Sequence, residues 1–168
     1  MWSRRPPLPA DVRAALGLTR ADRVLASAPL ADGGWAVATQ ADLLVTRAGA
    51  VLRRPWCDVD RAAFDPAHDV VTVQWVDAEP SLRLRTANSV GTRLPLVVRE
   101  RVEWSVVLGE EVVLPRGRTA KVAVRRDVDG TLFSQVLAGP GADLDDPDVA
   151  RLVDAAEQRV RAAVGLPM

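Results

Sequence analysis

The spacing of apolar residues changes once along this chain, and that change restricts the folds it can adopt. From Asp22 to Thr86, apolar residues alternate with polar ones in short runs, which is the period of β-strands. From Leu94 to Val107 the apolar residues instead lie three and four positions apart, as on one face of a helix. The pattern therefore predicts several short strands followed by one closing helix.

Seven strands are predicted before that helix, each bounded by turn-forming residues. Their ranges are Asp22–Ala31, Trp35–Thr39, Asp42–Thr46, Ala50–Arg54, Val59–Phe64, Val70–Val76 and Leu82–Thr86. A short helix at Pro9–Leu16 is expected to precede them. The run Asp32-Gly33-Gly34 predicts the first hairpin turn, because glycine adopts positive φ without steric cost.

The closing helix is predicted to be amphipathic. Its buried stripe is formed by Leu94, Val97, Val98 and Val102. Its solvent side carries Arg99, Glu100 and Glu103. Trp104, near the end of the helix, is expected to plug the mouth of an open barrel.

The remainder of the chain is predicted to be an addition of three strands and a helix. The strands are Glu110–Leu114, Thr119–Arg126 and Thr131–Ala138. Asp146 is placed to cap the final helix, and Gly165 to end it. The fold class is therefore mainly β with helices (α+β). Three regions are expected: an arm and short helix at 1–21, a barrel with its closing helix at 22–108, and an appended segment at 109–168 packed on the barrel.

Composition limits the environment of the protein. No apolar run in the 168 residues approaches the roughly 20 needed to span a bilayer. Cys57 is the only cysteine, so an internal disulfide is impossible, and a cytoplasmic location is expected. The net charge is zero, but residues 81–126 hold ten Arg or Lys against four Glu, and residues 127–168 hold eight Asp or Glu against three Arg.

Three short segments give the chain a resemblance to a known fold. Trp35-Ala36-Val37-Ala38-Thr39 is followed by Asp42-Leu43-Leu44-Val45, and later by Arg54-Pro55-Trp56-Cys57-Asp58-Val59. A strand ending in threonine, a strand with paired leucines and a Pro-Trp-x-Asp-Val segment resemble the pleckstrin-homology-like barrel of uncharacterised, actinobacterial-type bacterial proteins. The resemblance covers about half the chain.

The resemblance implies a partly open barrel of seven antiparallel strands, closed at one end by a helix. Such barrels serve as binding or scaffolding modules for peptides, proteins or, in eukaryotes, phosphoinositides. The lipid-binding members carry a Lys/Arg-rich first hairpin, whereas this chain has Asp22-Arg23 and the acidic turn Asp32-Gly33-Gly34 there. Phosphoinositide binding is therefore not expected.

An arginine-rich face is the second candidate for function. The possible anion-binding residues are Arg83, Arg85, Arg116, Arg118 and Arg125, with Lys121 and Arg126 in the same hairpin as the last three. Phosphate contacts need such clusters. The alternative is a solvated sheet face whose charge is balanced by the acidic last helix.

Tryptophans offer a further candidate surface. Trp35, Trp75 and Trp104 fit core positions, whereas Trp56, beside Pro55 at a strand entrance, is the possible partner-binding residue. No catalytic residue, metal site or cofactor is predicted. Asp127–Gly130 fits a hairpin turn better than a calcium loop, because the twelfth position is Ala138.

The other reactive side chains do not assemble into a recognisable set. Asp58 and Asp60 share a strand face without an evident partner base, and nothing in the sequence brings Cys57 near the single histidine, His68. The sequence thus predicts a non-enzymatic binding or scaffolding module that contacts another protein. The alternatives are an anion-binding module for nucleic acid or acidic lipid and, less favoured, an enzyme that uses Asp58, Asp60 or His68.

Overall fold

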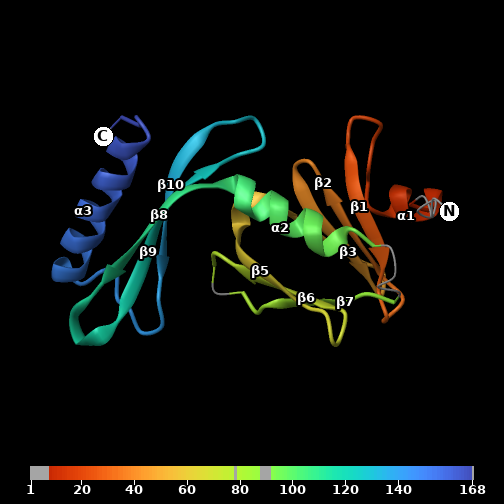
Figure 1. The fold of residues 1–168 in the computed structure, drawn as a ribbon, viewed down its shortest axis with the longest axis horizontal. Coiled ribbons are helices and arrows are strands. Elements are labelled where there is room, and N and C mark those ends of the chain that lie inside the picture. The colour runs from red at the N-terminus through yellow and green to blue at the C-terminus, as the bar shows by residue number, and fades with distance from the viewer. Residues whose placement is uncertain (1–7, 78, 88–91, 168) are drawn as a thin grey trace. The chain divides into compact units, whose positions relative to one another are not determined.

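The computed structural model describes residues 8–77, 79–87 and 92–167. They form ten strands in three antiparallel sheets, of four, three and three strands, together with three α-helices (Figure 1). The α+β class is therefore confirmed. By its internal contacts the chain divides into two compact units, residues 1–102 and 103–168. The packing of the appended segment on the barrel stays a prediction.

The first unit contains two of the sheets. The four-stranded sheet has the order β1 (Val24–Pro29), β2 (Trp35–Thr39), β3 (Asp42–Arg47) and β4 (Ala50–Pro55). The three-stranded sheet has the order β5 (Val59–Asp65), β6 (Val70–Trp75) and β7 (Leu82–Arg85). A short 3₁₀ turn, η1 (Trp56–Asp58), joins β4 to β5. Each strand lies within two residues of its predicted bounds, because the period-2 pattern and the turn residues agree.

The first hairpin depends on two glycines. Gly33 has a φ of +89°, which favours glycine over any other residue. At Gly34 the constraint is steric, since a Cβ there would lie 1.9 Å from the backbone oxygen of Thr46 on β3. The backbone N–H of Trp35 also donates to the Thr46 hydroxyl, at 3.1 Å. The turn between β1 and β2 thus packs directly against β3, with no room for a side chain at Gly34.

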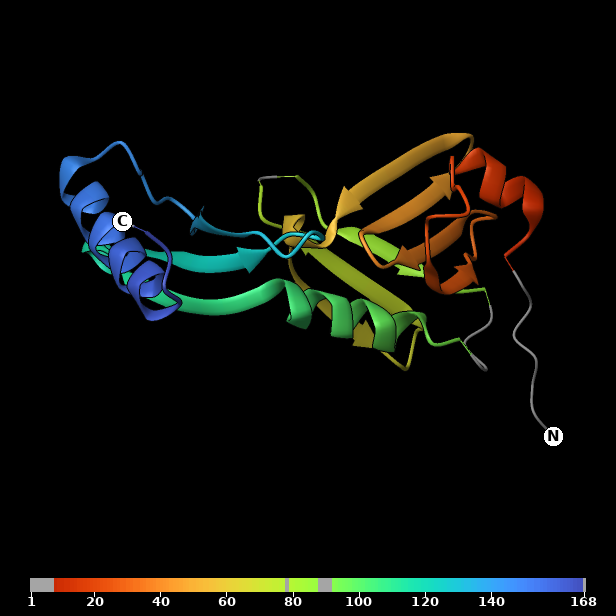
Figure 2. The ribbon, with the colours of Figure 1, turned by 90° about the horizontal axis from the view of Figure 1, so that it is seen from above.

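The two central strands of the four-stranded sheet, β2 and β3, are buried on both faces. Val37 and Leu44 point away from the main core and are covered by Leu16 and Leu18, which follow α1 (Ala10–Ala15). Figure 2 shows α1 at the outer side of this sheet. This second layer explains why β2 and β3 are nearly continuous in apolar residues, since a strand covered on both faces has no polar side.

The two sheets share one core but do not form a closed barrel in the described residues. Between β1 and β7 there is a single isolated bridge, Leu30 to Thr86, flanked by a 2.9 Å hydrogen bond from the Ala31 N–H to the Arg85 carbonyl. The seven strands that the resemblance placed in one partly open barrel therefore form two separate sheets. The core between them includes Leu43, Trp75 and Leu84.

Helix α2 (Leu94–Ser105) completes that core. Its buried residues in the shared core are the predicted stripe, Leu94, Val97, Val98 and Val102. Trp104 is half-buried and lies under the guanidinium of Arg126, 5.1 Å from the ring centre, and its role as a barrel plug stays a prediction. The helix ends two residues earlier than predicted, because β8 begins at Val106, which pairs with Arg125 of β9, and Val107 lies at the following shift of register.

The second unit is a three-stranded sheet covered on one face by a helix. Its elements are β8 (Val106–Val113), the 3₁₀ turn η2 (Pro115–Gly117), β9 (Thr119–Arg126), β10 (Leu132–Ala138) and α3 (Pro147–Ala163). Val149, Val153, Ala156 and Val160 of α3 pack on Val122 and Val124 of β9. Asp146 caps α3 as predicted, since its side chain accepts a 2.9 Å hydrogen bond from the Asp148 N–H.

Gly34→Ala tests the close approach at the first hairpin. The added methyl group would meet the Thr46 oxygen, so the free energy of unfolding is expected to fall by about 1–3 kcal/mol or more. Urea unfolding followed by circular dichroism measures the change. Gly109→Ala is the control, because a Cβ there has only ordinary contacts of 3.8 Å and longer. Equal stability of the two variants would contradict the steric reading.

Candidate functional site

One concave surface in the described residues is a groove between β5 and the start of α2. It has a volume of about 390 Å³. The lining residues are Ala62, Ala63, Phe64, Val71, Thr92, Pro95, Leu96 and Arg99. All of them belong to the first unit, and the groove is bordered by a strand on one side and a helix on the other. We call it the β5–α2 groove.

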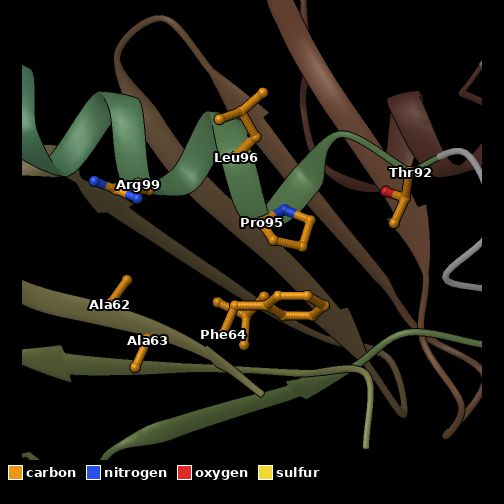
Figure 3. A pocket seen from close by; sticks show the side chains of 8 residues that line it. Ala62, Ala63, Phe64, Thr92, Pro95, Leu96 and Arg99 are labelled. Carbon is orange, nitrogen blue, oxygen red and sulfur yellow. The ribbon is translucent and has the colours of Figure 1, made fainter. Parts of the chain in front are cut away.

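The groove exposes apolar side chains that a closed core would cover. In the sheet, Phe64 is opposite Val71, which pairs in turn with Leu84, and both of these are buried. Phe64 occupies the last position of this row, at the sheet edge, and is 44% exposed, while Leu96 on α2 is 48% exposed. Figure 3 shows the Phe64 ring lying opposite Pro95 at the first turn of the helix.

Polar groups lie at the rim of the groove. Thr92 precedes α2, and its hydroxyl accepts a 3.2 Å hydrogen bond from the Leu94 N–H, which fixes the start of the helix. Arg99 is the one charged residue among those lining the groove, and Figure 3 shows it further along α2 on the side of Ala62. The surface is therefore apolar at the centre and positive at one end.

The strand that borders the groove is an edge strand. The sheet order is β5-β6-β7, so within its own sheet β5 pairs with β6 alone, and Ala62–Phe64 lies at the sheet edge. An antiparallel edge presents the N–H and C=O groups of alternate residues, ready to pair with another strand. An apolar groove and an open strand edge thus adjoin along Ala62–Phe64.

The sequence did not single out this groove. Phe64 was placed at the end of a strand and Arg99 on the solvent face of the helix. The one available signal was Leu96, which lies off the buried stripe of α2 yet is apolar. A helix residue of that kind, near an aromatic residue at a strand end, could have indicated an exposed apolar surface.

The predicted anion-binding arginines divide between the two units. Arg83 and Arg85 are exposed on β7 in the first unit. Arg116 and Arg118 lie at or beside η2 in the second unit, where Arg118 donates a 2.6 Å hydrogen bond to the Gly141 carbonyl and ties two loops together. The structure therefore brings Arg83 and Arg85 together, and separately Arg116 and Arg118.

Arg125 corrects the sequence interpretation. It is 0% exposed near the end of β9, and its guanidinium donates to the Ser105 hydroxyl at 3.1 Å and to the Gln135 side-chain oxygen at 3.2 Å. A buried cation held this way cannot meet a ligand at the surface. The alternation of the hairpin had suggested an exposed position, because sequence does not show which charged residue acquires internal partners.

Trp56 also requires correction. Its ring is 2% exposed, and its indole N–H donates a 3.0 Å hydrogen bond to the Thr39 carbonyl. It joins η1 to the end of β2 and belongs to the shared core, so its ring forms no partner-binding surface. Trp75 is buried in the same core, as predicted, whereas Trp35 is partly exposed.

The acidic candidates have structural partners. Asp58 accepts a 3.0 Å hydrogen bond from Arg54, which also contacts Asp77 at 2.6 Å and lies 4.6 Å from the centre of the Trp75 ring. The exposed His68 contacts Asp65 at 2.8 Å within one turn, and Cys57 is buried. Each of these groups is explained by its local packing.

The predicted hairpin turn at Asp127–Gly130 is confirmed. The Gly130 N–H donates to the Asp127 carbonyl at 3.0 Å, and Asp129 accepts from the Thr131 N–H at 2.8 Å. Within residues 8–77, 79–87 and 92–167, no three or more His, Cys, Asp or Glu side chains are grouped so as to hold a metal ion. Across the same residues, every helix is too short or too polar to traverse a lipid bilayer.

No protein-family model matches this chain, and neither a curated protein nor a solved structure is significantly similar to it. The functional argument therefore depends on the geometry of the β5–α2 groove and of the exposed arginines.

Asp77→Asn tests the Arg54 network through pH. The hydrogen bond from Arg54 lowers the pKa of Asp77 below its ordinary value, and the backbone N–H of Glu79 acts in the same direction. A carboxylate with a depressed folded-state pKa stabilises the protein above its unfolded pKa of about 3.9, and this contribution is lost as the pH falls through the folded pKa. The variant should therefore be less stable than the parent at neutral pH, with a gap that narrows from about pH 5 downward.

Urea unfolding at a series of pH values measures this gap. The matched control is Asp77→Asn in an Arg54→Met background, where the hydrogen-bond donor is gone. There the difference in stability between the two chains should shrink to the part that the backbone N–H of Glu79 causes. A gap that persists unchanged in that background would mean that Arg54 does not cause the shift.

Proposed function

We propose that this protein is a non-enzymatic binding module, of pleckstrin-homology-like type, that holds an extended segment of another protein in the β5–α2 groove. The observation that carries the proposal is the adjacency of an open strand edge and an exposed apolar groove. The edge offers main-chain hydrogen bonds, and the groove offers a place for side chains, which together are the requirements of strand addition.

The arrangement of the first unit supports the pleckstrin-homology-like assignment. A four-stranded and a three-stranded antiparallel sheet follow one another along the chain, and a helix comes directly after the last strand and packs in the core between them. This order is the one that the resemblance of Trp35–Thr39 and its neighbouring segments implied. The single Leu30–Thr86 bridge corresponds to a barrel that stays partly open.

The chemistry of the groove favours a particular class of partner. An added strand places alternate side chains toward the sheet face that carries Phe64. Apolar side chains at those positions would be covered by Phe64 and Leu96, and a carboxylate at one end would meet the positive end at Arg99. The volume of about 390 Å³ lies within the roughly 300–1,000 Å³ typical of ligand pockets.

Selection from a random peptide library of about twelve residues tests the proposal. Retained peptides should alternate apolar and polar residues, with an acidic residue toward one end. Phe64→Ser and Leu96→Ser should each weaken binding about tenfold, because a central apolar contact is worth roughly 1.4 kcal/mol. N-methylation of single peptide bonds should reduce binding at alternate positions only, since an edge strand pairs with every second residue.

Val51→Ser is the matched control. Val51 is also 48% exposed and lies on the edge strand β4 of the same unit, away from the residues that line the groove. Its substitution should leave peptide affinity unchanged. Retained peptides that bind the Phe64 and Val51 variants equally well would overturn the assignment of the groove.

A further inference from the structure

The face of the β5–β6–β7 sheet that points away from the shared core carries a row of arginines. The register fixes which residues lie on it, since Ala63, Thr72 and Arg83 form one cross-strand row. The neighbouring rows place Arg61 opposite Gln74 and Arg85 opposite Val70. We call this surface the outer face of the second sheet.

The side chains on this face confirm its orientation. Arg61 donates a 2.5 Å hydrogen bond to the Gln74 side-chain oxygen, so both project to the same side. The arginines of this face, Arg61, Arg83 and Arg85, are exposed. The residues that alternate with the outer-face positions along β6 and β7 are buried on the opposite side of the sheet, namely Val71, Val73 and Leu84. The alternation of β7, Leu-Arg-Leu-Arg, is therefore the alternation between core and outer face.

The charge of the outer face is strongly one-sided. The one carboxylate on its described rows is Asp65, which is held by the Ala67 N–H at 3.0 Å and by His68 at 2.8 Å. Arg47 reaches the edge of the face, where it donates to the Arg83 carbonyl at 2.5 Å, and its own charge is paired with Asp32 at 2.6 Å. The face therefore has three arginines and one carboxylate that is already hydrogen-bonded within its own turn, which leaves a local excess of positive charge.

The geometry suits a chain of regularly spaced anions. Successive residues on one face of a strand are about 6.6 Å apart, and the two outer strands of the sheet are about 9.6 Å apart. Arg83 and Arg85 thus follow one another on β7, and Arg61 lies on β5 in the row next to that of Arg83, with Thr72 and Gln74 on the strand between them. Arg, Thr and Gln side chains commonly donate hydrogen bonds to the phosphate and sugar oxygens of nucleic acids.

We infer that the outer face of the second sheet binds the phosphate backbone of a single-stranded nucleic acid without selecting its bases. A flexible single-stranded nucleic acid can place successive phosphates along this face, whereas a rigid duplex would contact it at only a few points. The described rows of the face carry no aromatic side chain on which a base could stack, so the face would not distinguish one base from another. An anionic membrane is disfavoured, because the face offers no exposed large apolar side chain to insert.

This inference does not rest on the proposed function. Ala63 lines the groove and also lies on the outer face. Phe64 and Leu96, which the groove test changes, are not on that face, and Arg83 and Arg85 do not line the groove. Either surface could fail its test while the other passes.

Binding of a labelled mixed-sequence oligonucleotide of about 20 nucleotides, measured by fluorescence anisotropy from low to moderate salt, tests the inference. Arg83→Gln with Arg85→Gln should weaken binding about tenfold at low salt. Removal of two phosphate contacts should also make the slope of log K against log salt shallower by about 1.4, since each contact to a single strand contributes about 0.7. Homopolymers of different bases should bind alike.

Arg20→Gln with Arg23→Gln is the matched control. Both arginines are exposed in the same unit and lie before β1, outside the three strands, so the net charge changes equally while the outer face is unaltered. Circular dichroism shows whether both double variants keep the fold. The control should retain the affinity and the salt slope of the parent chain.

Three results would overturn the inference. The first is absence of oligonucleotide binding by the parent chain at low salt. The second is an equal loss of affinity in the control, which would mean that overall charge acts rather than this face. The third is stronger binding, dependent on Arg83 and Arg85, to phosphatidylserine vesicles or to polyglutamate, which would assign the face to a membrane or to an acidic protein.

Discussion

The first unit depends on the burial of one helix stripe between two sheets that do not complete a barrel by themselves. Leu94, Val97, Val98 and Val102 of α2 fill the space that the single bridge between β1 and β7 leaves open. Each buried aliphatic side chain contributes roughly 1.5–3 kcal/mol, so this stripe is among the largest sources of stability in the unit. The helix therefore holds the sheets together as well as covering them.

The same packing creates the candidate site. A helix that buries Leu94 and Val97 must turn its other sides toward solvent, and Leu96 lies on one of those sides. Because β5 is the edge of its sheet, Phe64 has no further strand to cover it, and the two exposed side chains border one groove. The apolar groove thus follows from how the core is completed.

Local pattern predicted most elements of the fold. Trp35–Thr39 and Thr119–Arg126 match the observed strands at both ends, because their period and their bounding turns agree. The predicted end of α2 was wrong, since Val106 and Val107 continue the helical spacing without a breaker, and only the pairing of Val106 and Leu108 with β9 starts the strand there. The site was harder to predict because exposure depends on tertiary neighbours. Arg125 and Trp56 looked available for ligands and are buried, whereas Phe64 and Leu96 are exposed.

The buried guanidinium of Arg125 has a consequence for how this protein can change. Arginine keeps its charge at every pH at which the chain stays folded, so Arg125 cannot be neutralised by its surroundings as a buried lysine or carboxyl group can. Its ties to Ser105, the last residue of α2, and to Gln135 on β10 are therefore a permanent requirement of the second unit. Loss of either partner would remove one hydrogen bond from a buried cation, so substitutions at these positions should destabilise the second unit.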